Sequence, residues 1–259
     1  MSKKIGLALS GGGARGFAHA GVLRALAEYG IRIDLIAGTS AGSLAGGAYA
    51  AGMSPTKIEA FSSKLRWADL VRPSISPLGP LSNAPMARFI NNEFPVHRFE
   101  DLKIPFTAVA YDLENNCEVR LSEKGDLSFA ICASCAVPGI FVPLTEKDGR
   151  TLVDGGVTSP LPVDAVRAMG ADIIIAVDLL ACGAVTGRPR TAAGVLLQSA
   201  MALLRTASAL QHANADIVIE PQVAHIRIDQ IKKRDELMAL GFEAAMARLV
   251  EIRSIINGY

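Results

Sequence analysis

Short β-branched runs alternate with longer helical patterns along this chain, and this alternation constrains the fold most. Strand-length runs that alternate with helical patterns predict a mainly parallel sheet with helices packed on it. Half of the 259 residues are apolar, so the chain can bury a substantial core. We therefore expect residues 1–259 to form one α/β domain, a three-layer α/β/α fold with a mainly parallel central sheet.

The pattern places the elements at definite positions. The expected strands are residues 5–9, 35–37, 106–112, 118–122, 151–153, 173–178 and 217–220. The expected helices are residues 17–29, 41–51, 55–63, 127–134, 162–169, 191–210 and 232–256. From residue 53 to about residue 100 the periodicity weakens, and several prolines and the only tryptophan appear. We expect a cap of short helices and loops there, bordering a binding site.

A glycine-rich turn, "SGGGARG", follows the first expected strand. Gly11, Gly13 and Gly16 fit the G-x-G-x-x-G spacing of a dinucleotide-binding turn. Such a site needs an acidic residue at the end of the second strand. Asp34 instead precedes that strand, so binding of a nucleotide or an acyl-phosphate is the weaker alternative.

A second turn, "GTSAGS", fits the G-x-S-x-G pattern between an expected strand and a small-residue helix. This is the setting of a nucleophile elbow, in which crowding at a sharp turn admits only small neighbours. Gly38 and Gly42 would supply that clearance, and Ser40 would stand at the carboxyl edge of the sheet. An ordinary capped turn is the alternative.

Loops that leave the carboxyl ends of adjacent parallel strands face one another. Beside a serine nucleophile, the N–H groups of Gly11, Gly12 and Gly13 would stabilise a tetrahedral oxyanion rather than a pyrophosphate. Arg15 would either bind an anionic group of the substrate or brace this loop.

A third turn, "LVDGGV", places Asp154 at a strand end before Gly155 and Gly156. Ser40 needs a base, and the residues leave two alternatives open. Asp154 could act directly as the partner in a dyad. A triad would instead use His212 or His225, which follow the serine but do not stand just past a strand with glycine-type turn chemistry. The four histidines are His19, His97, His212 and His225.

Charge and composition narrow the class of partners. The formal net charge is +1 and no basic block indicates nucleic acid. No run approaches the ~18 uninterrupted apolar residues of a membrane span, and the amino terminus lacks a secretory pattern. Cys132 and Cys135 form a C-x-x-C without a second pair, so we interpret them as buried helix residues rather than a metal or redox site. We expect a cytoplasmic protein.

Taken together and in this order, "GGGARG", "GTSAGS" and "DGG" resemble the signature of the patatin-like phospholipase family. The similarity is greatest to its small bacterial members, which also resemble the catalytic domain of neuropathy target esterase. "ASCAVPGIFVPL", "DGGVTSPLPVDAVRAMGADIIIAVDL" and "ELMALGFEAA" also read like family segments. The resemblance runs from about residue 4 to residue 245 and is thinnest over the cap.

The resemblance implies a patatin-like fold and a serine–aspartate dyad that hydrolyses fatty-acyl esters of phospholipids, lysophospholipids or related lipids. Ser40 would be the nucleophile and Asp154 the general base, and the glycine-rich turn would supply the oxyanion hole. No metal or cofactor is implied. Peripheral membrane contact through Trp67, Leu70 and Leu78 of the cap is one expectation, and packing of these side chains onto the core is the alternative. The sequence does not indicate an oligomeric state.

Overall fold

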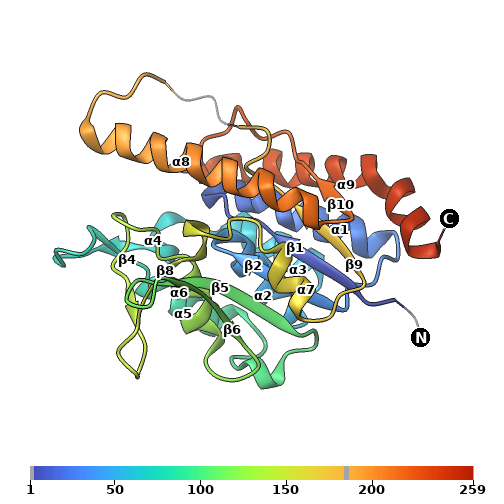
Figure 1. The fold of residues 1–259 in the computed structure, drawn as a ribbon, viewed down its shortest axis with the longest axis horizontal. Coiled ribbons are helices and arrows are strands. Elements are labelled where there is room, and N and C mark those ends of the chain that lie inside the picture. Colours follow the sequence, from blue (N-terminus) through green and yellow to red (C-terminus); the bar gives the residue numbers. More distant parts are fainter. Residues whose placement is uncertain (1–2, 184–186, 259) are drawn as a thin grey trace.

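A computed structural model describes residues 3–183 and 187–258 of the chain (Figure 1). Its main sheet contains eight strands in the order β10-β9-β1-β2-β5-β8-β7, with β6 paired to β5. These strands are β1 (Ile5–Leu9), β2 (Leu35–Thr39), β5 (Phe106–Asp112), β6 (Cys117–Ser122), β7 (Leu144–Thr145), β8 (Thr151–Asp154), β9 (Ile173–Val177) and β10 (Ile217–Ile219). A separate small hairpin pairs β3 (Arg72–Pro73) with β4 (Leu81–Ser82).

Helices cover the sheet and build the cap. They are α1 (Phe17–Glu28), α2 (Ala41–Ala50), α3 (Pro55–Lys64), α4 (Trp67–Leu70), α5 (Ala84–Glu93), α6 (Leu127–Ser134), α7 (Val163–Ala168), α8 (Ala192–Gln211) and α9 (Arg234–Asn257). Every strand and helix expected from the sequence is present, and no end differs by more than two residues. The short strands β3, β4 and β7 were not expected, since two residues leave no periodic pattern to detect.

The sheet is mixed, with mostly parallel strands. β10, β9, β1, β2 and β5 run parallel, whereas β6, β8 and β7 add an antiparallel edge. Thr39 at the end of β2 pairs with Val109 of β5, and the next β5 residue, Ala110, pairs with Asp154 of β8. Because β6 pairs with the other edge of β5, β2 and β8 lie end to end along one edge of β5, and the register brings the end of β8 to the end of β2.

The two faces of the sheet carry side chains of different size. On one face, large residues such as Leu7 and Ile36 pack in the main apolar cluster with α1, α2, α3, α6 and α9. On the other face, small residues such as Ala8 and Ala176 pack against α7. The small side chains allow the single helix α7 to lie close to the sheet. The three-layer α/β/α architecture is confirmed, with helices distributed unequally between the faces.

The cap consists of α3, α4, the β3–β4 hairpin and α5, as the weak periodicity of this segment indicated. Its large apolar side chains join the main cluster rather than forming a separate one, among them Ile58, Phe61, Ile90 and Phe94. The cap is thus packed onto the core over much of its length. The limits of the domain and of the cap stay predictions.

The three cap residues expected at a membrane lie in different environments. Leu70 is buried in the main cluster, so membrane contact through its side chain was a wrong expectation. Trp67 is 39% exposed and its Nε1–H donates to the Asp229 carbonyl at 3.2 Å. Leu78, in the β3–β4 turn, is 62% exposed.

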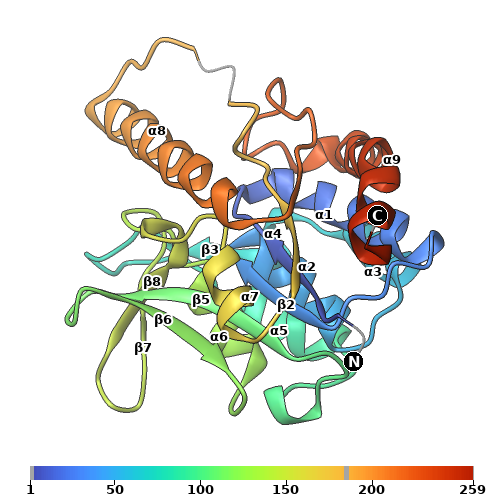
Figure 2. The same ribbon diagram turned by 45° about the vertical axis from the view of Figure 1, so that its right-hand side comes forward.

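Helix α8 stands apart from the layers. In both views it projects from the body of the molecule, and its free amino-terminal end lies far from the sheet (Figures 1 and 2). Residues 192–214 are long and apolar enough to cross a membrane by length and composition, and only 6% of the most apolar window is buried. No such segment was expected from the sequence, because Gln198 and Arg205 interrupt its apolar run.

Candidate active site

Ser40 occupies a strained turn between β2 and α2. Its backbone adopts φ 53° and ψ −123°, a conformation that costs a non-glycine residue about 1–3 kcal/mol. The neighbouring glycines are required by close approach of the backbone. A β-carbon on Gly38 would overlap the carbonyl of Gly42, and one on Gly42 would overlap the carbonyl of Leu9. The nucleophile elbow expected from "GTSAGS" is therefore formed in this structure.

Hydrogen bonds on both sides hold the strained turn. The Ser40 carbonyl accepts from the Ser43 N–H at 2.8 Å and from the Ser43 hydroxyl at 2.6 Å. The Ser40 N–H donates to the Ser134 hydroxyl at 2.9 Å, and that hydroxyl donates to the Val109 carbonyl at 2.6 Å. Because Ser134 is fully buried, these bonds are shielded from water. They fix the main chain of Ser40 and leave its side chain free for other contacts.

Asp154 ends β8 and faces the Ser40 side chain. Its carboxylate accepts a hydrogen bond from the Gly156 N–H at 2.8 Å. Its own N–H donates to the Ala136 carbonyl at 2.9 Å. Burial raises the pKa of Asp154 to about 6, and the nearby Ser40 hydroxyl and the Gly156 N–H oppose this rise, because they stabilise the charged form. Gly155 lies so close to the Val109 carbonyl that a β-carbon would not fit.

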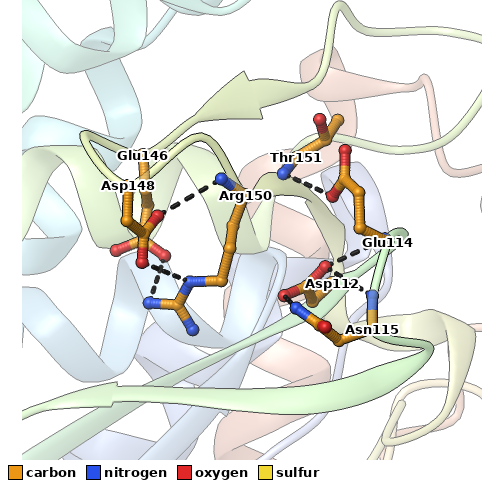
Figure 3. A network of polar contacts seen from close by, with 7 residues as sticks. All are labelled: Asp112, Glu114, Asn115, Glu146, Asp148, Arg150 and Thr151. Carbon is orange, nitrogen blue, oxygen red and sulfur yellow. Dashed lines mark hydrogen bonds and ion pairs between the residues drawn. The ribbon is translucent and has the colours of Figure 1, made fainter.

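A polar network fixes the beginning of β8 (Figure 3). Asp112 ends β5 and accepts from the N–H groups of Glu114 and Asn115 at 2.9 and 3.1 Å and from the Asn115 amide at 2.8 Å. The hydrogen bonds from Asn115 lower the pKa of Asp112. The Glu114 carboxylate then accepts from the Thr151 N–H at 2.7 Å, which joins the β5–β6 turn to the first residue of β8.

The turn between β7 and β8 is closed by charged side chains. Arg150 forms ion pairs with Glu146 at 2.7 Å and with Asp148 at 2.9 Å (Figure 3). Exposed pairs of this kind contribute little free energy, so their part is to define the turn. Together with the β5–β6 turn they position β8, and therefore Asp154, relative to β5.

The glycine-rich turn lies directly against the nucleophile. A β-carbon on Gly11 would stand 3.4 Å from the β-carbon of Ser40. The Gly11 N–H donates to the Pro160 carbonyl at 3.0 Å, so in this structure it is already paired. Within the described residues, the N–H groups of Gly12 and Gly13 have no acceptor. Gly13 has φ +58° and a β-carbon there would stand 2.7 Å from the Ile228 carbonyl.

Arg15 is buried beneath this turn. Its guanidinium donates to four main-chain carbonyls, those of Leu179, Gly183, Ala224 and Ile226, at 2.7–3.3 Å. Burial lowers the pKa of Arg15. Of the two expected roles, this geometry fits the brace, since the guanidinium is turned toward loops of the protein. Gly16 lies against Ala41 at the start of α2. A β-carbon added to Gly16 would stand only 2.5 Å from the Ala41 β-carbon.

The histidines considered for a triad are bonded elsewhere. His212 Nε2 lies 2.8 Å from the buried Asp178 carboxylate, which also accepts from the Ser208 hydroxyl at 2.7 Å. His225 Nε2 lies 2.7 Å from Glu236. His19 is fully buried, with Nε2 at 2.8 Å from the Ser10 carbonyl, and burial lowers its pKa to about 4. The structure thus brings Ser40 together with a carboxylate and holds these imidazoles on other partners.

The two C-x-x-C cysteines and Ser134 lie on one segment behind the site. Cys132 is within α6 and Cys135 follows it, and both are free, buried thiols. Burial raises the pKa of Cys132 to about 12 and that of Cys135 well above its usual value. No group of three metal-ligating residues occurs within residues 3–183 and 187–258. Sequence reasoning missed the role of Ser134, because a serine in a small-residue helix carries no signal of its own.

A mixed α/β sheet with a serine elbow beside a buried carboxylate is typical of serine hydrolases. Within that class, the chain belongs to the patatin-like phospholipase family, whose model matches residues 7–167. This match contains Ser40, Asp154 and the glycine-rich turn.

Relatives of different lengths match about two thirds of the chain. An NTE family protein of Mycobacterium tuberculosis is 41% identical over 187 residues, which cover 69% of this chain and 49% of the relative. Patatin-like phospholipase domain-containing protein 6 of Homo sapiens is 36% identical over 184 residues, covering 68% of this chain and 13% of the relative. The chain therefore spans about half the length of the mycobacterial relative and a smaller part of the human one. VipD from Legionella pneumophila shares the fold, with a TM-score of 0.60 at 16% identity over 97% of this chain and 67% of VipD.

Proposed function

We propose that this protein hydrolyses fatty-acyl ester bonds of phospholipids or lysophospholipids through a Ser40–Asp154 dyad and an acyl-enzyme. The observation that carries this proposal is the approach of the Ser40 elbow to a buried carboxylate at the end of β8, whose pKa is raised to about 6 and whose charged form the Ser40 side chain stabilises. A carboxylate with this pKa is mostly ionised near neutral pH and accepts a proton more readily than an exposed aspartate. Membership of the patatin-like phospholipase family supports lipid esters as the substrate class.

In the first step, Ser40 Oγ attacks the acyl carbonyl carbon while its proton passes to Asp154. The carbonyl oxygen becomes an oxyanion, and the unpaired N–H groups of Gly12 and Gly13 are the proposed donors to it. Such a donor typically contributes about 3 kcal/mol of transition-state stabilisation. The intermediate then expels the alcohol portion of the lipid, which takes the proton from Asp154, and the acyl group remains on Ser40.

In the second step, water attacks the acyl-enzyme with Asp154 again as the proton acceptor. Collapse of this second tetrahedral intermediate releases the fatty acid and returns the proton to Ser40 Oγ. The two half-reactions use the same three groups, and none of them requires an imidazole. His212 and His225 are bonded to Asp178 and Glu236, and this favours the dyad over a triad.

Labelling with a fluorophosphonate, followed by mapping of the modified residue, tests the proposal. We expect one label, on Ser40, and none in Ser40→Ala. Asp154→Asn should slow labelling by about 100-fold or more, because the hydroxyl loses its proton acceptor. His212→Ala and His225→Ala should label within about threefold of the unmodified protein, since neither ring contacts Ser40 in this mechanism. Loss of labelling in either histidine variant, with the fold intact, would establish a triad instead.

A further inference from the structure

Helix α8 presents a row of leucines to solvent. Leu196, Leu203 and Leu210 are 72%, 73% and 74% exposed, and we call these three residues the α8 stripe. Residues seven apart lie two turns apart on the same side of a helix, so the stripe is continuous along α8. Ser208 is the only buried residue of this helix. An exposed apolar face of this length marks an interaction surface.

The inner side of the same helix reaches the active site. A β-carbon on Gly156 would stand 3.0 Å from Leu204 Cδ2 and 3.0 Å from Asp154 Oδ1. The last turn of α8 is held to β9, because the Ser208 hydroxyl donates to Asp178 at 2.7 Å. Helix α8 therefore lies beside the catalytic carboxylate on its inner side and carries the stripe on its outer side.

The arginines and the lack of acidic residues give α8 and the segment before it a positive charge. Between Asp178 and Asp216 the sequence contains Arg188, Arg190 and Arg205 and no acidic residue. None of these arginines makes an ion pair with another residue of the described ranges. Arginines beside an exposed apolar helix favour a surface that is apolar beneath and anionic at its boundary, as a bilayer with anionic headgroups is.

A second copy of the chain fits this face less well. Ser199 and Thr206 lie between the leucines, at the positions where a paired helix needs apolar side chains. Two acid-free, arginine-bearing helices would also repel one another. The β3–β4 turn, which carries Ile75 at 106% and Leu78 at 62% exposure, lies on the same side of the molecule as the free end of α8 in both views (Figures 1 and 2).

We propose that α8 docks on anionic lipid surfaces with its stripe inserted at the headgroup boundary, and thereby brings Ser40 to lipid substrates. This inference rests on the proposed function for the source of the substrate. The helix lies along the surface rather than across it, because its last turn stays bonded to Asp178 and its inner side faces the site.

Binding to vesicles tests the proposal in the Ser40→Ala background, where no lipid is consumed. Vesicles of phosphatidylcholine with phosphatidylglycerol should bind the protein. The variant L196Q/L203Q/L210Q should bind about 100-fold more weakly, because three leucines contribute roughly tenfold each and insert only in part. The matched control L113Q/V250Q removes exposed apolar side chains from other elements and should bind as the parent does.

The arginines are tested separately from the leucines. R188Q/R190Q should remove most of the preference for vesicles that contain phosphatidylglycerol over phosphatidylcholine alone, while the remaining binding still depends on the stripe. With Ser40 intact, L196Q/L203Q/L210Q should hydrolyse a soluble short-chain ester within about twofold of the unmodified protein but lose activity on vesicle phospholipid. This soluble-ester rate also reports that the variant is folded.

Three results would overturn the docking proposal. The stripe variant could bind vesicles as tightly as its parent, the protein could resist extraction from vesicles at alkaline pH as a spanning helix does, or it could be a dimer without lipid that the stripe substitutions dissociate. Failure of the proposed function is distinguishable from these, since it would leave stripe-dependent vesicle binding intact with no ester hydrolysis in any variant.

Discussion

Asp154 combines two demands that oppose each other. A catalytic base needs a pKa near the working pH, and an exposed aspartate falls well below it. Burial at the end of β8 raises the pKa to about 6, whereas the Ser40 side chain and the Gly156 N–H stabilise the charged form. The result is a carboxylate that is ionised near neutral pH and lies beside the hydroxyl from which it would take a proton.

This environment predicts the pH dependence of the reaction. The base must be ionised, so kcat/KM on a soluble short-chain ester should rise with pH, reach half its maximum near pH 6, the pKa of Asp154, and level off above about pH 7. Initial rates across this range measure the acid limb of the free enzyme. His212→Ala and His225→Ala should keep the same limb. A limb that disappears in either variant would show that an imidazole, rather than Asp154, is the titrating group.

Two site residues were identifiable from sequence because their motifs specify local geometry. The G-x-S-x-G and D-G-G patterns each describe a turn, and Ser40 and Asp154 lie where those turns place them. Roles that depend on distant partners were not predictable. Gly11 differs from Gly12 only because the Pro160 carbonyl accepts its N–H, and Arg15 finds its acceptors in loops far along the chain.

The end of α6 connects the two proposed catalytic residues, Ser40 and Asp154. Ser134 closes this helix and accepts from the Ser40 N–H, while the Ala136 carbonyl just beyond it accepts from the Asp154 N–H. One short segment therefore sets the positions of Ser40 and Asp154 relative to each other. Such alignment matters because a displacement of about 1 Å can cost about 100-fold in rate.

Replacing Ser134 should therefore impair turnover more than binding. Ser134→Ala leaves the Ser40 N–H and the Val109 carbonyl unpaired, and we expect kcat to fall about 10- to 100-fold with KM nearly unchanged. Kinetics on a soluble ester and the rate of fluorophosphonate labelling measure this split. We class Ser134 as a positioning residue, since it acts through Ser40.

A serine on the same helix supplies the control. Ser128 is also buried, and its hydroxyl donates to Asp126 at the start of α6 at 2.7 Å, remote from Ser40 in the hydrogen-bond network. Ser128→Ala should reduce stability without the loss in kcat. Equal kinetic losses in both variants would show that α6 contributes only stability.

The elements themselves were largely predictable, because alternating strand and helix patterns survive in a single sequence. The direction in which the strands pair and the exposure of the helices were less predictable. β8 was expected as a strand, and it runs antiparallel to β5. This direction depends on the pairing of Ala110 with Asp154, which the composition of β8 does not contain. Helix α8 was also expected as a helix. Its exposure depends on how the other helices already cover the sheet, which the local pattern does not contain.

The whole molecule carries the site at a cost in stability. Ser40 holds strained dihedrals, and Asp154 is buried as an acid with no cation among its hydrogen-bond partners. Functional sites commonly retain such features because activity depends on them. Removing them therefore improves stability but abolishes activity. Asp154→Asn keeps the shape of the side chain and removes its charge. We therefore expect this variant to be inactive and more stable than the unmodified protein near pH 8.

The sign and range of this effect follow from the pKa. Folding raises the pKa of Asp154 from 3.8 to about 6, so the folded state binds the proton more tightly, and the unmodified protein loses stability as pH rises between these values. A pKa difference of about two corresponds to roughly 3 kcal/mol, which is the upper limit for the gain in Asp154→Asn above about pH 6. Denaturant midpoints near pH 8 should differ accordingly and converge near pH 4. Asp148→Asn, which changes a 56% exposed carboxylate, should show no such convergence. A gain that is independent of pH would mean that burial does not raise the pKa of Asp154, and the acid limb near pH 6 would then need another group.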